Sequence, residues 1–297
     1  MAGEHDFLEW LRTQRKKSEL VLVPQGDDLA VLKWPGDDLL LVGVDQVLDG
    51  VHFDSTIHPP RAIGRKAMNR NLSDCAAMGC LPAAAVTTAA LPVGSGLDYA
   101  KELYLGLRDA ADKFGCRIVG GDTGSWSGKL VLTVTILGRS AGVEPVKRSG
   151  AKVGDSIYVT GPLGGSILGR HMNFEPRVDL GRRLAHSGKV TAMIDISDGL
   201  SRDLEHICRQ SGVGAILDAD AIPIHADALK LSQINQEPSL NHALNDGEDH
   251  ELLLTGKLEG LDLPVTRIGT MTARLGMFLR TPDHLSALEP RGWDHHL

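Results

Sequence analysis

The chain has 297 residues, of which 42% are hydrophobic and 23% are charged, and this is typical of a globular protein with one large or two medium domains. Its formal net charge of −7 argues against a nucleic-acid partner, because nucleic-acid-binding proteins present basic surfaces. The sequence lacks any run of about 18 apolar residues and any signal-peptide pattern, which predicts no membrane contact and a cytoplasmic location.

The first half of the chain alternates short apolar runs with longer helical patterns. Spacing of apolar residues predicts helices over residues 5–15, 63–79 and 97–114. Apolar runs bounded by Gly, Pro and Asp predict strands at residues 20–23, 29–33, 39–44, 83–90, 116–119 and 130–137. This half is therefore expected to be β-rich, with helices crossing the strands.

A Gly-rich and Pro-containing stretch at residues 140–154 predicts a domain boundary, which divides the chain into residues 1–140 and 141–297. Beyond it, helices are predicted at residues 179–186, 200–210 and 226–232. Strands are predicted at residues 156–160, 192–195, 215–217, 252–255 and 265–268. The mixture indicates an α+β fold.

Short acidic motifs recur beside glycines or at the ends of predicted strands. Carboxylates held close together cannot all ionise without a compensating cation, and carboxylate oxygens suit Mg²⁺, which commonly bridges acidic side chains to phosphates. A single Gly-Asp pair is common in ordinary turns, so the prediction of a metal-dependent nucleotide site depends on the whole set. The motifs are Gly26-Asp27-Asp28, Val44-Asp45, Asn71-Leu72-Ser73-Asp74, Gly120-Gly121-Asp122-Thr123, Asp195-Ile196-Ser197-Asp198-Gly199 and Gly247-Glu248-Asp249.

Together with Asp49-Gly50-Val51-His52-Phe53 and Arg148-Ser149-Gly150-Ala151-Lys152, these motifs resemble in order and spacing the thiamine-monophosphate kinase family, part of the aminoimidazole ribonucleotide synthetase-like superfamily. The resemblance implies an N-terminal β-rich domain that binds ATP and dimerises, and a C-terminal α/β sandwich domain that completes the active site. It also implies a homodimer that transfers the γ-phosphoryl group of ATP directly to thiamine monophosphate, with Mg²⁺, and releases thiamine diphosphate and ADP.

The same resemblance assigns roles to individual residues, with no side chain acting as the chemical catalyst. An arginine fork matches phosphate, and an aromatic face beside a carboxylate suits a cationic thiazolium ring. Nucleotide contacts are assigned to Gly121, Asp122, Arg148 and Ser197, and substrate contacts to His52, Glu248 and Trp293. The implied metal ligands are Asp28, Asp45, Asp74, Asp122, Asp195 and Asp198.

Two alternatives stay open at the level of sequence. Gly43, Val44 and Gln46 surround Asp45 where the family usually has hydroxyl residues, and Gly124 replaces a threonine, which is compatible with a binding protein of the same fold that has lost turnover. Aminoimidazole ribonucleotide synthetase is the nearest enzymatic alternative, although the motifs around His52 and Glu248 favour the kinase.

Overall fold

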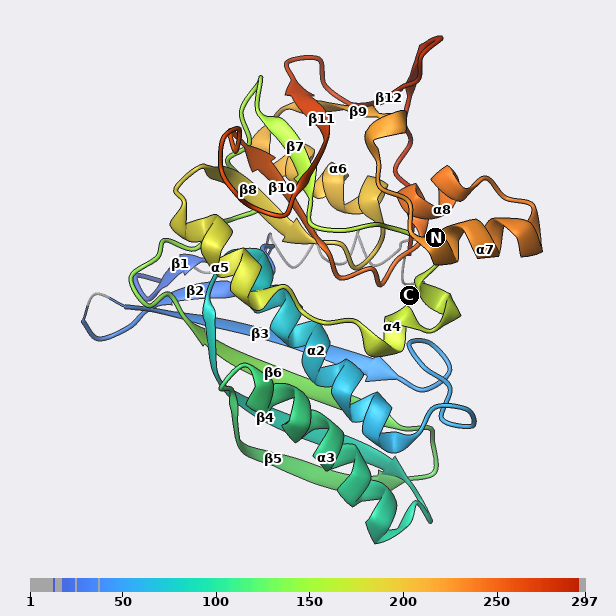
Figure 1. The fold of residues 1–297 in the computed structure, drawn as a ribbon. Coiled ribbons are helices and arrows are strands. Elements are labelled where there is room, and N and C mark those ends of the chain that lie inside the picture. Colours follow the sequence, from blue (N-terminus) through green and yellow to red (C-terminus); the bar gives the residue numbers. More distant parts are fainter. Residues whose placement is uncertain (1–12, 14–17, 25, 37, 294–297) are drawn as a thin grey trace.

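The computed structural model describes residues 13, 18–24, 26–36 and 38–293 (Figure 1). The helix predicted at residues 5–15 lies outside the described residues, apart from Thr13. In the described part, a six-stranded sheet and a seven-stranded sheet are built from the N-terminal and C-terminal halves of the chain, and helix α2 (Pro60–Met78) lies between them (Figure 1).

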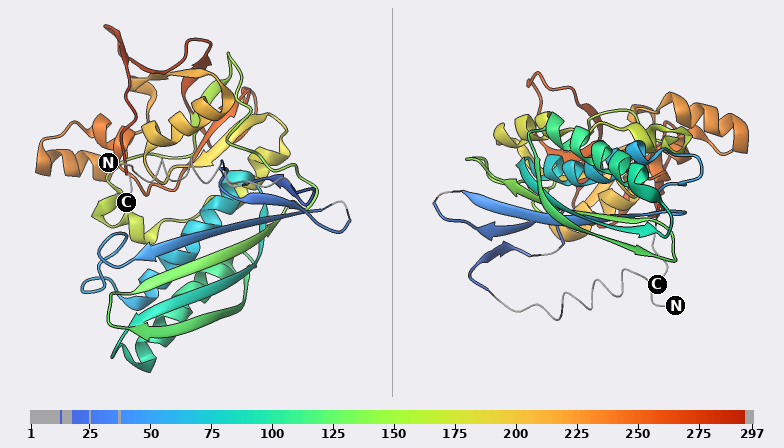
Figure 2. Two further views of the ribbon diagram at one scale, coloured as in Figure 1. Left: turned by 180° about the vertical axis from the view of Figure 1, so that it is seen from behind. Right: turned by 90° about the horizontal axis from the view of Figure 1, so that it is seen from below.

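The N-terminal sheet has the strand order β1-β2-β3-β6-β4-β5. Only β4 and β5 are parallel, and α3 (Gly96–Lys113) connects them. Both α2 and α3 lie on one face of the sheet (Figure 2), where alternate residues of β6 such as Leu132, Val134 and Ile136 are buried. The strands are β1 (Val21–Val23), β2 (Ala30–Lys33), β3 (Leu39–Leu48), β4 (Leu81–Pro92), β5 (Arg117–Trp126) and β6 (Val131–Arg139).

Helix α2 links the two halves of the molecule. Pro60 occupies its first turn, where a missing N–H costs nothing, and the helix ends at Gly79 with the left-handed φ of 65°. One side of α2 packs on β3 and β6, while another side packs on β8 (Val190–Asp195) and α5 (Val178–His186). The helix is buried almost all round, so polar residues on α2 can face sites in either half.

The C-terminal sheet has the order β13-β12-β9-β11-β7-β10-β8, in which only β9 and β12 are parallel. Helix α6 (Leu200–Ser211) packs on β8 and β9, and Leu204 and Ile207 of this helix enter a second core with Ile194. The remaining elements are β7 (Ser156–Val159), β9 (Gly214–Asp218), β10 (Leu252–Gly256), β11 (Thr266–Thr272), β12 (Met277–Arg280), β13 (Leu285–Ala287), α4 (Arg170–Asn173), α7 (Ala226–Asn235), α8 (Ser239–Asn245) and the 3-10 turns at Ser166–Leu168 and Ala219–Ala221.

Every strand and helix predicted within the described residues is present, but two of the acidic motifs are not at strand ends. Strand β3 continues to Leu48 and β5 to Trp126, so Asp45 and Asp122 lie inside strands. Glycine and aspartate are tolerated in β5 because it is an edge strand that pairs on one side only. Short elements such as α8 and β13 were not predicted, since a few residues carry little periodicity.

All four cysteines are buried and free of disulfide bonds. Within the described ranges, none of the helices has both the length and the apolar character that crossing a bilayer requires.

Candidate active site

Three of the predicted metal ligands come together between the two halves of the molecule. Asp28 lies in the loop between β1 and β2, Asp74 lies near the end of α2, and Asp195 is the last residue of β8. One carboxylate oxygen from each lies within 4.8 Å of the others. The close packing of α2 against β8 therefore assembles a carboxylate cluster, defined here as Asp28, Asp74 and Asp195.

Burial disfavours the charged form of the carboxylates in this cluster. It raises the pKa of Asp28 to about 6, although Arg148 opposes the shift, and it raises the pKa of Asp74 well above its usual value with help from Asp45 and Asp195. Asp195 differs: burial disfavours its charge, but hydrogen bonds from His250 and Ser73 lower its pKa. Full ionisation of the cluster thus requires a cation, and three carboxylates fit the hard oxygen donors that Mg²⁺ prefers.

Neighbouring side chains fix the orientation of these carboxylates. Ser73 Oγ donates to Asp195 Oδ2 at 2.6 Å, and His250 Nδ1 lies 3.2 Å from the same oxygen. The His250 ring stacks on Phe174 with 3.8 Å between the ring centroids. Supporting contacts of this kind usually tune the affinity of a metal site.

Arg148 reaches the cluster from the segment between the two sheets. Its Nη2 lies 2.9 Å from Asp28 Oδ1, and its backbone N–H donates to Asp27. The ion pair with Asp28, followed by charges of Asp203 and Asp195, keeps the pKa of Arg148 above its usual value despite burial. The predicted nucleotide contact thus lies beside a predicted metal ligand.

Asp45 lies next to the cluster but is joined to a different set of charges. Arg70 Nε donates to Asp45 Oδ2 at 2.9 Å, and Arg70 Nη1 donates to Glu248 Oε1 at 3.2 Å. Lys66, which is completely buried, lies 2.7 Å from Glu248 Oε1 and donates to the carbonyl oxygen of His52 at 2.5 Å. Two helical cations therefore connect Asp45 to the backbone around His52 and to Glu248.

The linked charged residues Asp45, Arg70, Glu248 and Lys66 are largely buried, but each lies next to a charge of opposite sign. Burial lowers the pKa of Lys66 to about 8, against the opposing effect of Glu248. Burial alone would raise the pKa of Glu248, but Lys66 and Arg70 lower it below its usual value, so this carboxylate is ionised near neutral pH. The cavity wall at Glu248 thus carries a fixed negative charge.

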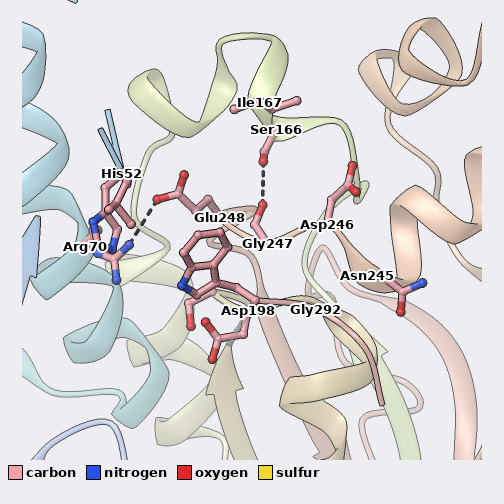
Figure 3. Close-up of a pocket in the computed structure, with 13 residues that line it drawn as sticks. His52, Arg70, Ser166, Ile167, Asp198, Asn245, Asp246, Gly247, Glu248 and Gly292 are labelled. Atoms are coloured by element: carbon pink, nitrogen blue, oxygen red, sulfur yellow. Dashed lines mark hydrogen bonds and ion pairs between the residues drawn. The ribbon is translucent and has the colours of Figure 1, made fainter. Parts of the chain in front are cut away.

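A cavity of about 410 Å³ lies beside these groups (Figure 3). The predicted substrate residues His52, Glu248 and Trp293 all line it, and Arg70 points from the same side as His52 toward Glu248. Trp293 is half exposed, and its backbone N–H donates to the carbonyl oxygen of Asp198 at 3.1 Å. The other residues around the cavity are Val51, Ser166, Ile167, Ser197, Asp198, Asn245, Asp246, Gly247 and Gly292.

The loop after β8 places Ser197 and Asp198 at the cavity. Asp203 of α6 accepts hydrogen bonds from the backbone N–H groups of Ser197, Asp198 and Gly199, at 3.1, 3.1 and 3.2 Å. The ligand atoms of Asp198 lie within 4.8 Å of those of Asp203 and His206, and not in the carboxylate cluster. The predicted metal ligands Asp195 and Asp198 are close in sequence, but Asp195 lies with Asp28 and Asp74, whereas Asp198 lies with Asp203 and His206.

The structure does not bring Gly121 and Asp122 to the cluster. Both lie in the exposed edge strand β5, and Asp122 Oδ1 accepts the backbone N–H of Thr123. Strands β6 and β4 separate β5 from β3, which places Asp122 about 14 Å from the strand that carries Asp45 at the usual spacing of strands. Within one chain, these two residues are thus separated from the other predicted ligands.

Lys66 and Arg70 were not predicted from the sequence. With Asp74 they follow the spacing i, i+4, i+8 on α2, which places all three on one face of the helix. Charged residues repeated every four positions were the signal available, but helical periodicity does not reveal that this face meets Glu248 from the other half of the chain.

Comparison with known proteins places this arrangement in a family. The chain matches the family models for AIR synthase related protein over residues 26–140 for the N-terminal domain and 152–280 for the C-terminal domain. Together these ranges cover most of the chain, and the chain belongs to the AIR synthase related family. The α+β fold expected from the sequence is confirmed.

Relatives that align over nearly the whole chain include proteins named thiamine-monophosphate kinase. The protein of that name from Rhodopirellula baltica is 40% identical over 308 residues, covering 98% of this chain and 97% of the relative. That from Bacillus subtilis is 32% identical, with coverage of 98% and 99%. The solved structure of AaThiL complexed with AMPPCP and TMP aligns with a TM-score of 0.87 and 29% identity, covering 99% of this chain and 97% of that one.

Proposed function

We propose that this protein is a thiamine-monophosphate kinase, which transfers the γ-phosphoryl group of ATP to thiamine monophosphate. The observation that carries the proposal is the position of the carboxylate cluster beside a cavity lined by His52, Glu248 and Trp293. Whole-chain relatives with this name, and a similar structure complexed with AMPPCP and TMP, support the same reaction.

ATP is the proposed co-substrate, and Mg²⁺ is the proposed metal. Asp28, Asp74 and Asp195 would hold the metal, and Asp45, which binds Arg70, and Asp198, which lines the cavity, are proposed as further ligands. A bound Mg²⁺ neutralises phosphate charge and thereby eases the approach of two anions. The contribution of the chain is to fix these carboxylates through Ser73, His250 and Arg148.

The cavity suits the acceptor because thiamine monophosphate carries a positive ring and a negative phosphate. Glu248 is ionised and lies at the wall of the cavity, and the Trp293 ring offers an aromatic face to a cationic ring. We assign His52 to the same end of the substrate, since Lys66 holds its backbone next to Glu248. Arg148 and Ser197 are assigned to the nucleotide.

A homodimer is part of the proposal, and it would explain how Gly121 and Asp122 can contribute to an active site. Val44, Val119 and Trp126 of the N-terminal sheet are 60%, 63% and 48% exposed, and burying these apolar side chains against a partner would be favourable. We propose that two copies pair through these sheets and that Gly121 and Asp122 serve the site of the partner. The division at residue 140 and the cytoplasmic location remain predictions.

An assay of ADP release with ATP and Mg²⁺ tests the proposal. Release that depends on thiamine monophosphate supports a kinase. ATP binding without turnover supports a binding protein of the same fold, which is the main alternative from the sequence. Release in the absence of thiamine monophosphate, with no stimulation by it, points to another acceptor.

A further inference from the structure

We propose that the Arg70 guanidinium binds the phosphate group of the acceptor and is a further catalytic residue of the reaction. This inference depends on the proposed function, and it concerns a residue to which neither the sequence motifs nor the relatives assign a role. It follows from the contacts of Arg70, from its position in the cavity and from the charge of its neighbours.

The Arg70 guanidinium is fixed by two ion pairs, but these use only part of its N–H donors. Its Nε binds Asp45 and its Nη1 binds Glu248, so two carboxylates from different halves of the chain fix the plane of the guanidinium. A guanidinium has five N–H donors, and the described residues provide acceptors for two of them. Three donors are therefore available to a ligand from a side chain that is only 14% exposed.

The position of these donors indicates which ligand they would bind. Arg70 lines the cavity with His52 and Glu248, and in Figure 3 the guanidinium lies on the same side as His52, with a dashed line joining it to the Glu248 carboxylate. Arg70 Nε binds Asp45, and Asp74 of the carboxylate cluster lies four residues further along the same helix, about one turn away. Arg70 thus lies between the acceptor cavity and the carboxylate cluster, where the two phosphates must meet.

The chemistry calls for a cation at this place. An oxygen of the acceptor phosphate forms a bond to the γ-phosphorus of ATP, the bond from that phosphorus to the β,γ-bridging oxygen breaks, and its electron pair remains on ADP. The acceptor oxygen is already deprotonated, so no general base is needed. A guanidinium fork binds a phosphate through paired hydrogen bonds and offsets the repulsion between the two anions.

Calorimetric titration can separate contact with phosphate from an indirect effect through Glu248. Thiamine monophosphate and thiamine, which lacks the phosphate, are each titrated into the full-length wild-type chain, Arg70→Gln and Arg70→Lys without ATP. We expect the preference for the phosphorylated ligand, measured as the ratio of the two dissociation constants, to fall at least tenfold in Arg70→Gln. Arg70→Lys keeps the charge but loses the fork, so an intermediate fall is expected.

Arg65→Gln is the matched control, because Arg65 lies on the same helix and contacts Asn173 outside the cavity. Its ratio should equal that of the wild type. If Arg70→Gln does not fold, Arg70→Lys decides the question. A ratio within threefold of the wild type in the folded Arg70 variants overturns the inference. Failure of the wild-type chain to bind thiamine monophosphate contradicts the proposed function itself.

Discussion

The hydroxyl of Ser73 on α2 donates a hydrogen bond to the Asp195 carboxylate at the end of β8, with 2.6 Å between the two oxygens. This single contact ties the N-terminal half to the C-terminal half at the carboxylate cluster. The Oδ2 atom of Asp195 is thus oriented by a hydroxyl that is itself fixed in a buried helix.

Ser73→Ala should weaken the metal site without unfolding the protein. Loss of the donor leaves Asp195 less firmly oriented, and removal of such supporting contacts commonly lowers metal affinity about 10-fold or more. The measurement is the Mg²⁺ concentration that gives half-maximal ADP release. Ser187→Ala is the control, because Ser187 makes a similar hydrogen bond to Leu184 far from the cluster. An unchanged Mg²⁺ requirement in Ser73→Ala would contradict the role given to this contact.

Asp74→Asn should abolish most turnover and leave a folded protein. We expect the rate to fall by more than about 100-fold, since a proposed ligand of the metal that neutralises phosphate charge is lost. Because burial and then neighbouring carboxylates raise the pKa of Asp74, the variant should unfold without Mg²⁺ at the same or a higher temperature than the wild type. Added Mg²⁺ should then stabilise the wild type more than the variant.

Thermal unfolding with and without Mg²⁺ measures this difference, and Asp98→Asn on the surface of α3 serves as the control. An equal Mg²⁺ shift in Asp74→Asn and the wild type, together with near-normal turnover, would remove Asp74 from the proposed metal ligands.

Asp122 is expected to act in the partner's site, and hybrid dimers can test this. Asp74→Asn and Asp122→Asn should each be nearly inactive alone. If Asp122 serves the partner, a hybrid of the two variants contains one intact site, so an equal mixture after subunit exchange should recover about one quarter of wild-type activity. No recovery in a mixture shown to contain hybrids would mean that both residues act within the same chain.

The central features of the fold could be predicted because they depend on local patterns. The apolar spacing along residues 63–79 and the alternating strands of the N-terminal sheet are readable from short windows. Glu248 at the cavity and Asp195 in the carboxylate cluster stood out because acidic motifs beside glycines are uncommon in such numbers.

The pairing of charges across the two halves could not be predicted. Lys66 and Glu248 are 182 residues apart in the chain, and only the packing of α2 against the C-terminal half brings them together. Likewise, the edge position of β5 is a property of the whole sheet, so the separation of Asp122 from Asp28 and Asp74 has no local signal.

Asp38→Asn should lower stability at neutral pH, and the loss should become smaller as the pH falls below about 4. Hydrogen bonds from Ser140 and then Arg139 hold the pKa of Asp38 well below its usual range. A carboxyl with a lowered pKa stabilises the fold above its unfolded pKa of about 3.9, and this contribution disappears as the pH falls toward the folded pKa. We expect a loss of about 1–2 kcal/mol in the free energy of unfolding at pH 7.

Urea unfolding of Asp38→Asn and the wild type at pH 7 and near pH 3 checks this prediction. The difference between them should shrink at the lower pH. The variant Asp283→Asn, on an exposed loop, should match the wild type at both pH values. A difference that stays constant with pH would show that Asp38 acts through packing and not through its charge.

Product identification tests the central claim most directly. The purified chain is incubated with ATP, Mg²⁺ and thiamine monophosphate, and both products are quantified by mass spectrometry over time. The account predicts one thiamine diphosphate for each ADP released, and neither product without Mg²⁺. ADP that accumulates without thiamine diphosphate, or an absence of both products when the chain is folded and binds ATP, would contradict it.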